Sequence, residues 1–141
     1  MLGPVSLLNP ISPIGDAFEL PIAIAGLVIA AASVWLAFSA VRALGRQWGF
    51  AARLVEGHRL VTKGPYRFVR HPVYISLLGM MIATGIVDAH WINLPFGIAI
   101  FLTGTMIRVG TEEKLLKEAF GAEFEAYARR VPAIIPGLHW D

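Results

Sequence analysis

The stretch 20–41 contains no charged residue, and it limits what this 141-residue chain can fold into. An α-helix rises 1.5 Å per residue, so about 20 apolar residues are enough to cross the roughly 30 Å hydrocarbon core of a bilayer. The whole chain is 56% hydrophobic and only 16% charged, whereas soluble domains have about 25% charged residues. One short domain cannot bury so much apolar surface internally. The sequence therefore predicts an integral membrane protein.

Two further apolar segments, 73–87 and 91–107, follow a basic connector. The polar residues 88–90 separate them, so we expect an antiparallel helical hairpin with 88–90 as its turn. Pro72 suits the first position of the entering helix, where its missing N–H costs nothing. Pro95 is expected to kink the returning helix or to mark its start. The prediction is an all-α membrane protein with about three transmembrane helices, one N-terminal span plus this hairpin.

The two ends of the chain have different characters. Three prolines interrupt residues 1–19, so we expect an irregular or interfacial segment there. Residues 108–141 are charged and amphipathic, which predicts a cytosolic amphipathic C-terminal helix. Gly121 is expected to end a helix after Phe120. We interpret 1–141 as a single membrane-embedded domain, in which 1–57 hold the first span and the start of the connector.

The basic residues predict the orientation in the membrane. All twelve Lys and Arg residues lie in 42–70 or 108–130. By the positive-inside rule both regions are cytoplasmic, with the N-terminus outside and the C-terminus inside. Arg67 and Arg70 are interpreted as cations that set this topology. The same distribution argues against nucleic acid as a partner of this chain, whose net charge is +2.

Several classes of chemistry find no support in the sequence. The chain has no cysteine, so it has no disulfide framework, thiolate metal site or thiol nucleophile. No spacing of His, Asp and Glu matches a zinc or di-iron site, and no metal is predicted. A Gly-rich strand–helix fingerprint for dinucleotides is also missing.

The connector 60–74 is the first candidate for a binding site. Gly64-Pro65 permits a tight turn and a close approach of the backbone to a ligand. His71 precedes Pro72 at the mouth of the hairpin. It is either a pH-sensitive hydrogen-bonding group of a site, or a helix-entry residue whose ring lies in the membrane interface.

A second candidate is the charged start of the C-terminal region. On a continuous helix Arg108 and Glu112 share a face one turn apart, and Glu113 follows directly. Such groups are costly at a membrane boundary unless they are paired or used. The alternative is a cytosolic helix end at which these side chains are simply solvated.

These two regions together resemble a known family. In their order and spacing they are similar to the isoprenylcysteine carboxyl methyltransferases and the related phospholipid N-methyltransferases, over 58–136. The residues that carry the resemblance are Leu60-Val61-Thr62-Lys63-Gly64-Pro65-Tyr66-Arg67, Arg70-His71-Pro72-Val73-Tyr74, Arg108-x-x-x-Glu112-Glu113, Phe120-Gly121, Tyr127, Arg130-Val131-Pro132 and Ile135-Pro136.

The resemblance implies an enzyme that binds S-adenosylmethionine at the cytosolic membrane face and releases S-adenosylhomocysteine. It implies that Arg108 binds a substrate carboxylate, and that Arg108 and Glu112 are the catalytic candidates. The eukaryotic members also have a glutamine upstream of these motifs, but Gln47 is too distant along the chain to be assigned to it. By position, the implied cofactor contacts are His58, Arg59, Leu60, Val61, Tyr66, His71, Pro72, Val73, Tyr74, Glu112 and Glu113.

The implied methyl acceptor is a lipid-like or prenylated molecule in the membrane. A carboxylate is already a nucleophile and needs only a cation such as Arg108 to orient it. An amine would need Glu112 or Glu113 as a base. We expect methyl ester formation, with phospholipid amine N-methylation as an alternative. An NADPH-dependent membrane reductase is another, because sterol reductases share an Arg-His-Pro-x-Tyr-like element, and a non-enzymatic membrane scaffold is a third.

Small residues in 20–41 predict close helix packing. Gly26 and Ala30 are four residues apart, a spacing that lets two helix backbones approach each other. The partner could be another helix of the same chain or a second copy in a homodimer.

Overall fold

The computed structural model describes residues 19–47, 59–87 and 93–134. Within these ranges every regular element is helical. His58, the turn at 88–90, the N-terminal segment 1–18 and Pro136 lie outside the described residues. The elements are α1 (Glu19–Leu44), η2 (Gly45–Gln47), η3 (Gly64–Arg67), α2 (Pro72–Val87), α3 (Asn93–Phe120) and α4 (Ala122–Ala128).

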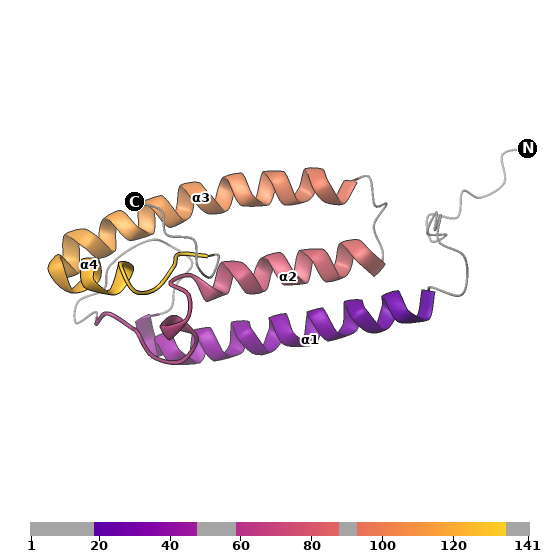
Figure 1. Ribbon diagram of the computed structural model, residues 1–141, viewed down its shortest axis with the longest axis horizontal. Coiled ribbons are helices and arrows are strands. Elements are labelled where there is room, and N and C mark those ends of the chain that lie inside the picture. Colours follow the sequence, from indigo (N-terminus) through magenta and orange to yellow (C-terminus); the bar gives the residue numbers. More distant parts are fainter. Residues whose placement is uncertain (1–18, 48–58, 88–92, 135–141) are drawn as a thin grey trace, which may run out of the picture.

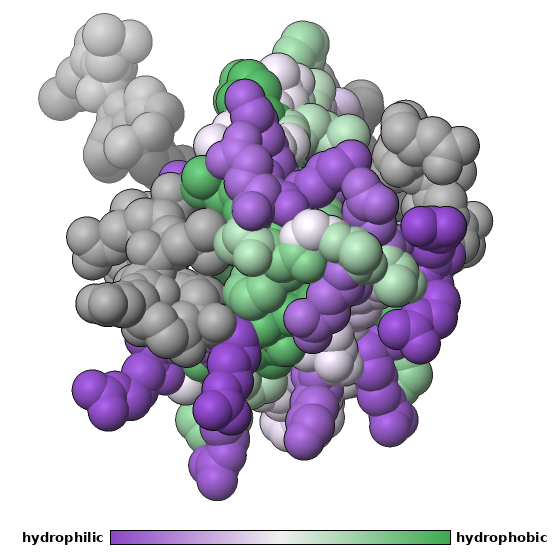
Figure 2. Space-filling model, turned by 90° about the vertical axis from the view of Figure 1, so that its left-hand side faces the viewer, coloured by the Kyte–Doolittle hydropathy of each residue, from purple (hydrophilic) through white to green (hydrophobic). Residues whose placement is uncertain are grey.

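The three long helices run alongside one another, with α2 antiparallel to α1 and α3 (Figure 1). This confirms the helices of the predicted hairpin. The end of α1, the start of α2 and the end of α3 meet at one end of the molecule, together with η3 and α4. We call this the charged end. Hydrophilic side chains project around it, with hydrophobic residues between them (Figure 2).

Two helices are long and apolar enough to cross a membrane, by length and composition. They are the segments Leu20–Gln47 and Asn93–Phe120. Helix α2 has 16 residues, which cover about 24 Å at 1.5 Å per residue. The third crossing therefore stays a prediction. Large side chains such as Trp35 on α1 are 70% exposed, as expected for surfaces that face lipid.

Helix α1 packs along α2 through a stripe of small side chains. Gly26, Ser33 and Ala40, each seven residues apart, are buried on α1. A Cβ atom on Gly79 of α2 would overlap the Ser33 hydroxyl. The prediction that small residues pack against another helix is confirmed, although Ala30 is only half-buried. Helix α2 occupies this stripe within one chain, and the homodimer stays a prediction.

Helix α3 continues without a break from the apolar region into the charged end. Pro95 lies in its first turn, so it marks the start of the helix and leaves the hydrogen-bond ladder intact. Gly121 has a φ angle of +49°, a conformation that glycine adopts at low cost after a helix. The predicted stop after Phe120 is therefore confirmed. The continuous helix carries Arg108 and its acidic neighbours out of the apolar segment in a fixed orientation.

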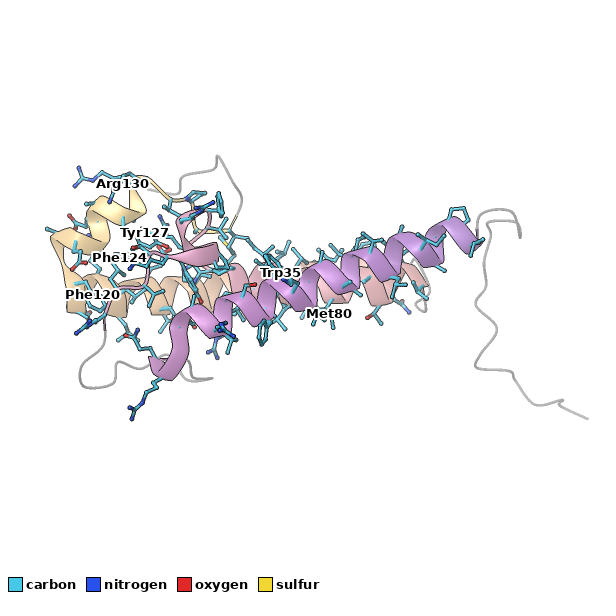
Figure 3. The ribbon with its side chains drawn as sticks, turned by 90° about the horizontal axis from the view of Figure 1, so that it is seen from below. Trp35, Met80, Phe120, Phe124, Tyr127 and Arg130 are labelled. Carbon is cyan, nitrogen blue, oxygen red and sulfur yellow. The ribbon has the colours of Figure 1, made fainter. Side chains whose placement is uncertain are left out.

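The charged end has a small hydrophobic core of its own. Phe124, Tyr127 and Val131 form it, and their exposed fractions are all below 9%. Figure 3 shows Phe124 and Tyr127 pointing inward from α4, while Arg130 extends away from the body of the protein. The predicted amphipathic C-terminal helix thus corresponds to the end of α3 followed by the short α4. This core holds α4 beside the connector.

Candidate active site

Arg70 joins three segments of the charged end. It lies just before α2, and its exposed fraction is only 7%. Its Nε and Nη2 atoms donate to the two carboxylate oxygens of Glu113 on α3, at 2.7 and 3.2 Å. Its Nη1 atom donates to the carbonyl oxygens of Ala128 and Val131, both at 2.7 Å. Arg70 was interpreted only as a topology cation, but its buried side chain also pairs with Glu113 and binds two backbone carbonyls. Its part in topology stays a prediction.

The His71 ring lies between two carboxylates of α3. Its Nε2 atom is 3.1 Å from Oε1 of Glu113, and its Nδ1 atom is 3.5 Å from Oε2 of Glu112. The ring is buried, with an exposed fraction of 6%. Adjacent residues on a helix point about 100° apart, so a single ring can reach both glutamates only from a position between them. Of the two interpretations of His71, the structure supports a hydrogen-bonding group within a polar cluster.

Tyr74 and Arg108 complete this cluster. The Tyr74 hydroxyl donates to Oε1 of Glu112 at 2.6 Å and accepts from Nε of Arg108 at 3.0 Å. Nη2 of Arg108 is 3.6 Å from the same glutamate oxygen. About half of the Arg108 side chain (49%) and a quarter of the Glu112 side chain (24%) are exposed. Arg108 makes this side of the cluster accessible, whereas Arg70 is buried on the other side, where the Glu113 side chain is exposed to the same 24% as that of Glu112.

The electrostatics of the cluster favour a charged His71. Burial acts to lower the pKa of His71, but hydrogen bonds to Glu112 and Glu113 and their negative charges outweigh burial. The pKa of His71 is therefore raised above its usual value of 6.5. A protonated imidazole has N–H donors on both ring nitrogens, which matches a carboxylate on each side. The imidazolium form thus satisfies both glutamates at once.

The connector reaches the cluster through a tight turn. Gly64 has a φ angle of +62° at the start of η3, a conformation that disfavours any side chain. Tyr66 follows and is buried, and burial raises its pKa. The hydroxyl of Tyr127 on α4 donates to the Tyr66 carbonyl oxygen at 2.6 Å, and burial raises the pKa of Tyr127 to about 12. Both phenols are therefore neutral, and this hydrogen bond ties α4 to the connector.

The predicted site residues fall into two groups. The structure brings together His71, Tyr74, Arg108, Glu112 and Glu113, which we call the polar cluster. The second group lies around it: Arg59 is exposed, Leu60 packs against the Phe124 core, Val61 and Val73 are half-buried, Tyr66 is buried in η3, and Pro72 is fully buried.

Sequence reasoning missed two residues of this region. Arg70 is one, and a signal for it existed: Glu112 and Glu113 point in different directions, so they need different cations, and Arg108 lies one turn from Glu112 on the same face. Gln47 is the other. Its side-chain oxygen accepts a hydrogen bond from the backbone N–H of Arg59 at 2.5 Å. The turn η2, which follows α1, therefore reaches the start of the connector, although Gln47 and Arg59 are 12 positions apart along the chain.

Comparison with known proteins places this geometry in context. The family model described as phospholipid methyltransferase matches residues 22–123. A cobalt-zinc-cadmium resistance protein of Cupriavidus metallidurans is 35% identical over 99 residues, which are 67% of this chain and 44% of that protein. Protein-S-isoprenylcysteine O-methyltransferase B of Arabidopsis thaliana is 34% identical over 60% of this chain and 43% of its own length. The corresponding Schizosaccharomyces pombe enzyme is 32% identical over 61% and 36%. The chain thus spans less than half the length of these relatives.

Proposed function

The chain belongs to the phospholipid methyltransferase family and is related to the protein-S-isoprenylcysteine O-methyltransferases, and on this basis we propose that it is a membrane enzyme that methylates a lipid-like acceptor with S-adenosylmethionine. The observation that carries the proposal is the accessible side of the polar cluster. There Tyr74, Arg108 and Glu112 meet where a membrane-length helix enters the charged end. The family assignment also places methyl transfer ahead of the reductase and scaffold alternatives.

The charge of the polar cluster complements the charge of the cofactor. S-adenosylmethionine, when bound, supplies a methyl group that is activated by a positive sulfonium. Glu112 offers a partly exposed carboxylate that would complement the positive sulfonium and amino groups. Its orientation is set by the Tyr74 hydroxyl and by the His71 ring. Gly64 and Tyr66 provide a turn whose backbone can approach a ligand closely.

Arg108 is suited to bind the acceptor. A guanidinium presents N–H donors in a planar fork that matches a carboxylate. Its Nε atom contacts the Tyr74 hydroxyl and its Nη2 atom lies near Glu112, while about half of the side chain is exposed. Arg108 would therefore orient an acceptor carboxylate, which needs no base because it is already a nucleophile. This supports methyl ester formation on an isoprenylcysteine-type acceptor.

The alternative is methylation of a phospholipid amine. The description of the matching family favours it, and Glu112 would then have to accept a proton from the amine. The carboxylate proposal and the amine proposal differ in the product. A methyl ester is hydrolysed by mild base, whereas an N-methyl group is not.

The position of the site relative to the membrane is part of the proposal. Exposed cations such as Arg42, Lys63 and Arg67 surround the charged end. The positive-inside rule supports a cytoplasmic location for this end and for the C-terminus, with the N-terminus outside. The acceptor would then reach Arg108 from the cytoplasmic leaflet.

Two measurements test the proposal in order. Binding of S-adenosylhomocysteine to the purified protein in detergent, measured by calorimetry, tests the cofactor. Incubation with methyl-labelled S-adenosylmethionine and a membrane lipid extract, followed by mild base, tests the acceptor. Base-labile label supports a carboxylate acceptor, and base-stable label supports an amine acceptor. The absence of any cofactor binding would refute the proposal that the protein is a methyltransferase.

A further inference from the structure

We propose that Arg70 is a positioning residue, which fixes Glu113 and through it the His71 ring, so that Glu112 stays turned toward the accessible side of the site. Arg70 is not expected to touch cofactor or acceptor. Its effect would pass through a chain of contacts from Arg70 to Glu113, from Glu113 to His71 and from His71 to Glu112. The kinetic part of this inference rests on the proposed function, whereas the structural part does not.

The first link is the anchoring of Glu113. Arg70 binds both of its carboxylate oxygens, and the His71 ring shares Oε1. A two-point guanidinium–carboxylate pair fixes orientation as well as distance. Glu113 is therefore already engaged within the protein. Although its position in the motif suggested a cofactor contact, its geometry is that of an anchor for the ring.

The second link is the orientation of the ring. Nε2 of His71 is 3.1 Å from Glu113, and Nδ1 is 3.5 Å from Glu112. The shorter contact is to the anchored glutamate, so Glu113 sets the ring and the ring in turn faces Glu112. Two charged groups face the ring directly, Glu112 and Glu113 from α3. The Tyr74 ring on α2 lies 6.0 Å from the His71 ring, measured between ring centroids. Arg70 acts on the ring indirectly, through its pairing with Glu113.

The third link is the segment that follows α4. Besides Glu113, Arg70 binds the carbonyl oxygens of Ala128 and Val131 through its guanidinium. Its backbone N–H donates to the Pro132 carbonyl at 2.9 Å, and that of His71 donates to the Ala133 carbonyl at 3.0 Å. The end of the described chain is therefore held against the residues that precede α2. One buried side chain thus couples the fold of the charged end to the orientation of the cluster.

The test compares variants that keep the fold. Glu113→Gln retains size and one acceptor oxygen but loses the charge that favours a protonated His71. Arg70→Lys retains a positive charge but cannot bind two carboxylate oxygens and two carbonyls together. Tyr127→Phe is the control, because it removes a different buried hydrogen bond of the charged end, the one to the Tyr66 carbonyl. All three variants keep the hydrophobic core of this end.

The first readout is independent of catalysis. The midpoint of the pH dependence of thermal stability in detergent reports the protonation of His71. We expect Glu113→Gln to move this midpoint to lower pH, because one of the two carboxylates that favour the imidazolium has lost its charge. Tyr127→Phe should lower stability at every pH and leave the midpoint in place. An unchanged midpoint in Glu113→Gln would overturn the inference even if the protein proves not to be a methyltransferase.

The second readout uses activity. Residues that act through one chain of contacts give non-additive effects. We expect Arg70→Lys and Glu113→Gln each to raise KM for the cofactor by about tenfold with a smaller change in kcat, because each disorders Glu112, and we expect the double variant to be no worse than the less active single variant. Additive losses would mean that Arg70 only supports the fold. If the wild type shows no methyl transfer at all, the proposed function fails, while the pH readout still decides the role of Glu113.

Discussion

The hydroxyl of Tyr74 on α2 lies 2.6 Å from the carboxylate of Glu112 on α3, and it accepts a hydrogen bond from Arg108 in return. In the chain, Tyr74 is 38 positions from Glu112 and 34 positions from Arg108. The phenol therefore links two helices at the point where they reach the charged end. Removing its oxygen should disorder Glu112 without disturbing the ring that packs beside His71.

Tyr74→Phe is expected to weaken the binding of S-adenosylhomocysteine by about tenfold. A hydrogen bond to a charged group contributes about 1.5–3 kcal/mol, and tenfold corresponds to about 1.4 kcal/mol. Calorimetry in detergent measures the change. Thr84→Val on the same helix is the matched control, because Thr84 bonds only to the Met80 carbonyl one turn away. Equal affinities for wild type and Tyr74→Phe would show that Glu112 does not contact the cofactor.

Arg108→Lys should separate the carboxylate acceptor from the amine acceptor. A lysine keeps the charge but loses the planar fork, so KM for a carboxylate acceptor should rise by about tenfold while cofactor affinity changes little. An amine acceptor would gain no benefit from the fork. Steady-state kinetics with a prenylated carboxylate substrate give the comparison. Arg46→Lys, at an exposed position of η2, is the control for replacing an arginine by a lysine away from the site.

The stability of the protein should decrease as the pH rises. The pKa of His71 is raised in the folded protein, so its stabilising contribution is complete below the unfolded value of about 6.5 and is lost as the pH passes through the folded value. We expect the thermal midpoint in detergent to fall across that interval in the wild type. His71→Gln should flatten this part of the curve. A midpoint that rises with pH over the same interval would contradict a charged His71.

Gly79→Leu should destabilise the contact between α1 and α2. Even a Cβ atom at this position would overlap the Ser33 hydroxyl, and overpacking a tight interface costs about 1–3 kcal/mol. Thermal unfolding in detergent should show a midpoint several degrees lower. Gly104→Leu on α3 is the matched control, because among the described residues a Cβ there meets no atom within 4 Å apart from its own helix backbone, and leucine favours a helix. If both variants were equally stable, the small-residue stripe would not determine helix packing.

Much of this architecture was predictable from local patterns. The uncharged stretch 20–41 and the apolar segments around 73–87 and 91–107 predicted membrane helices, because the transfer of a segment into lipid depends mainly on its own composition. Pro72 and Gly121 predicted helix boundaries because their backbone preferences act within one or two residues. Helices α1 and α2 lie within three residues of the predicted segments, whereas α3 continues beyond 107 to Phe120, and the third crossing stays a prediction.

The residues of the polar cluster were predictable from the sequence, whereas their arrangement was predictable only in part. The spacing of Arg108 and Glu112 on one helix placed them on a common face, and their pairing is observed. The resemblance added His71 and Tyr74, which lie beside them. Leu60, which is partly buried, and Pro72, which is fully buried, instead belong to the surrounding structure. Position in a motif therefore did not distinguish side chains that reach the accessible face from those that support it.

The sequence by itself determined which segments are apolar enough to form long helices, the start of α2 and the end of α3, and the charges that would meet at one end of the bundle. Only the tertiary structure decided which charges pair. Arg70 meets Glu113 across 43 residues, and Gln47 meets the backbone of Arg59 across 12. The physical reason is that burial and helix formation depend on residues within a few turns, whereas pairing depends on how each helix is rotated against its neighbours. For α1 and α2 that rotation follows from packing of the small residues Gly26, Ser33 and Gly79, and for α2 and α3 Gly85 lies against Leu94, so each rotation is a property of two helices together.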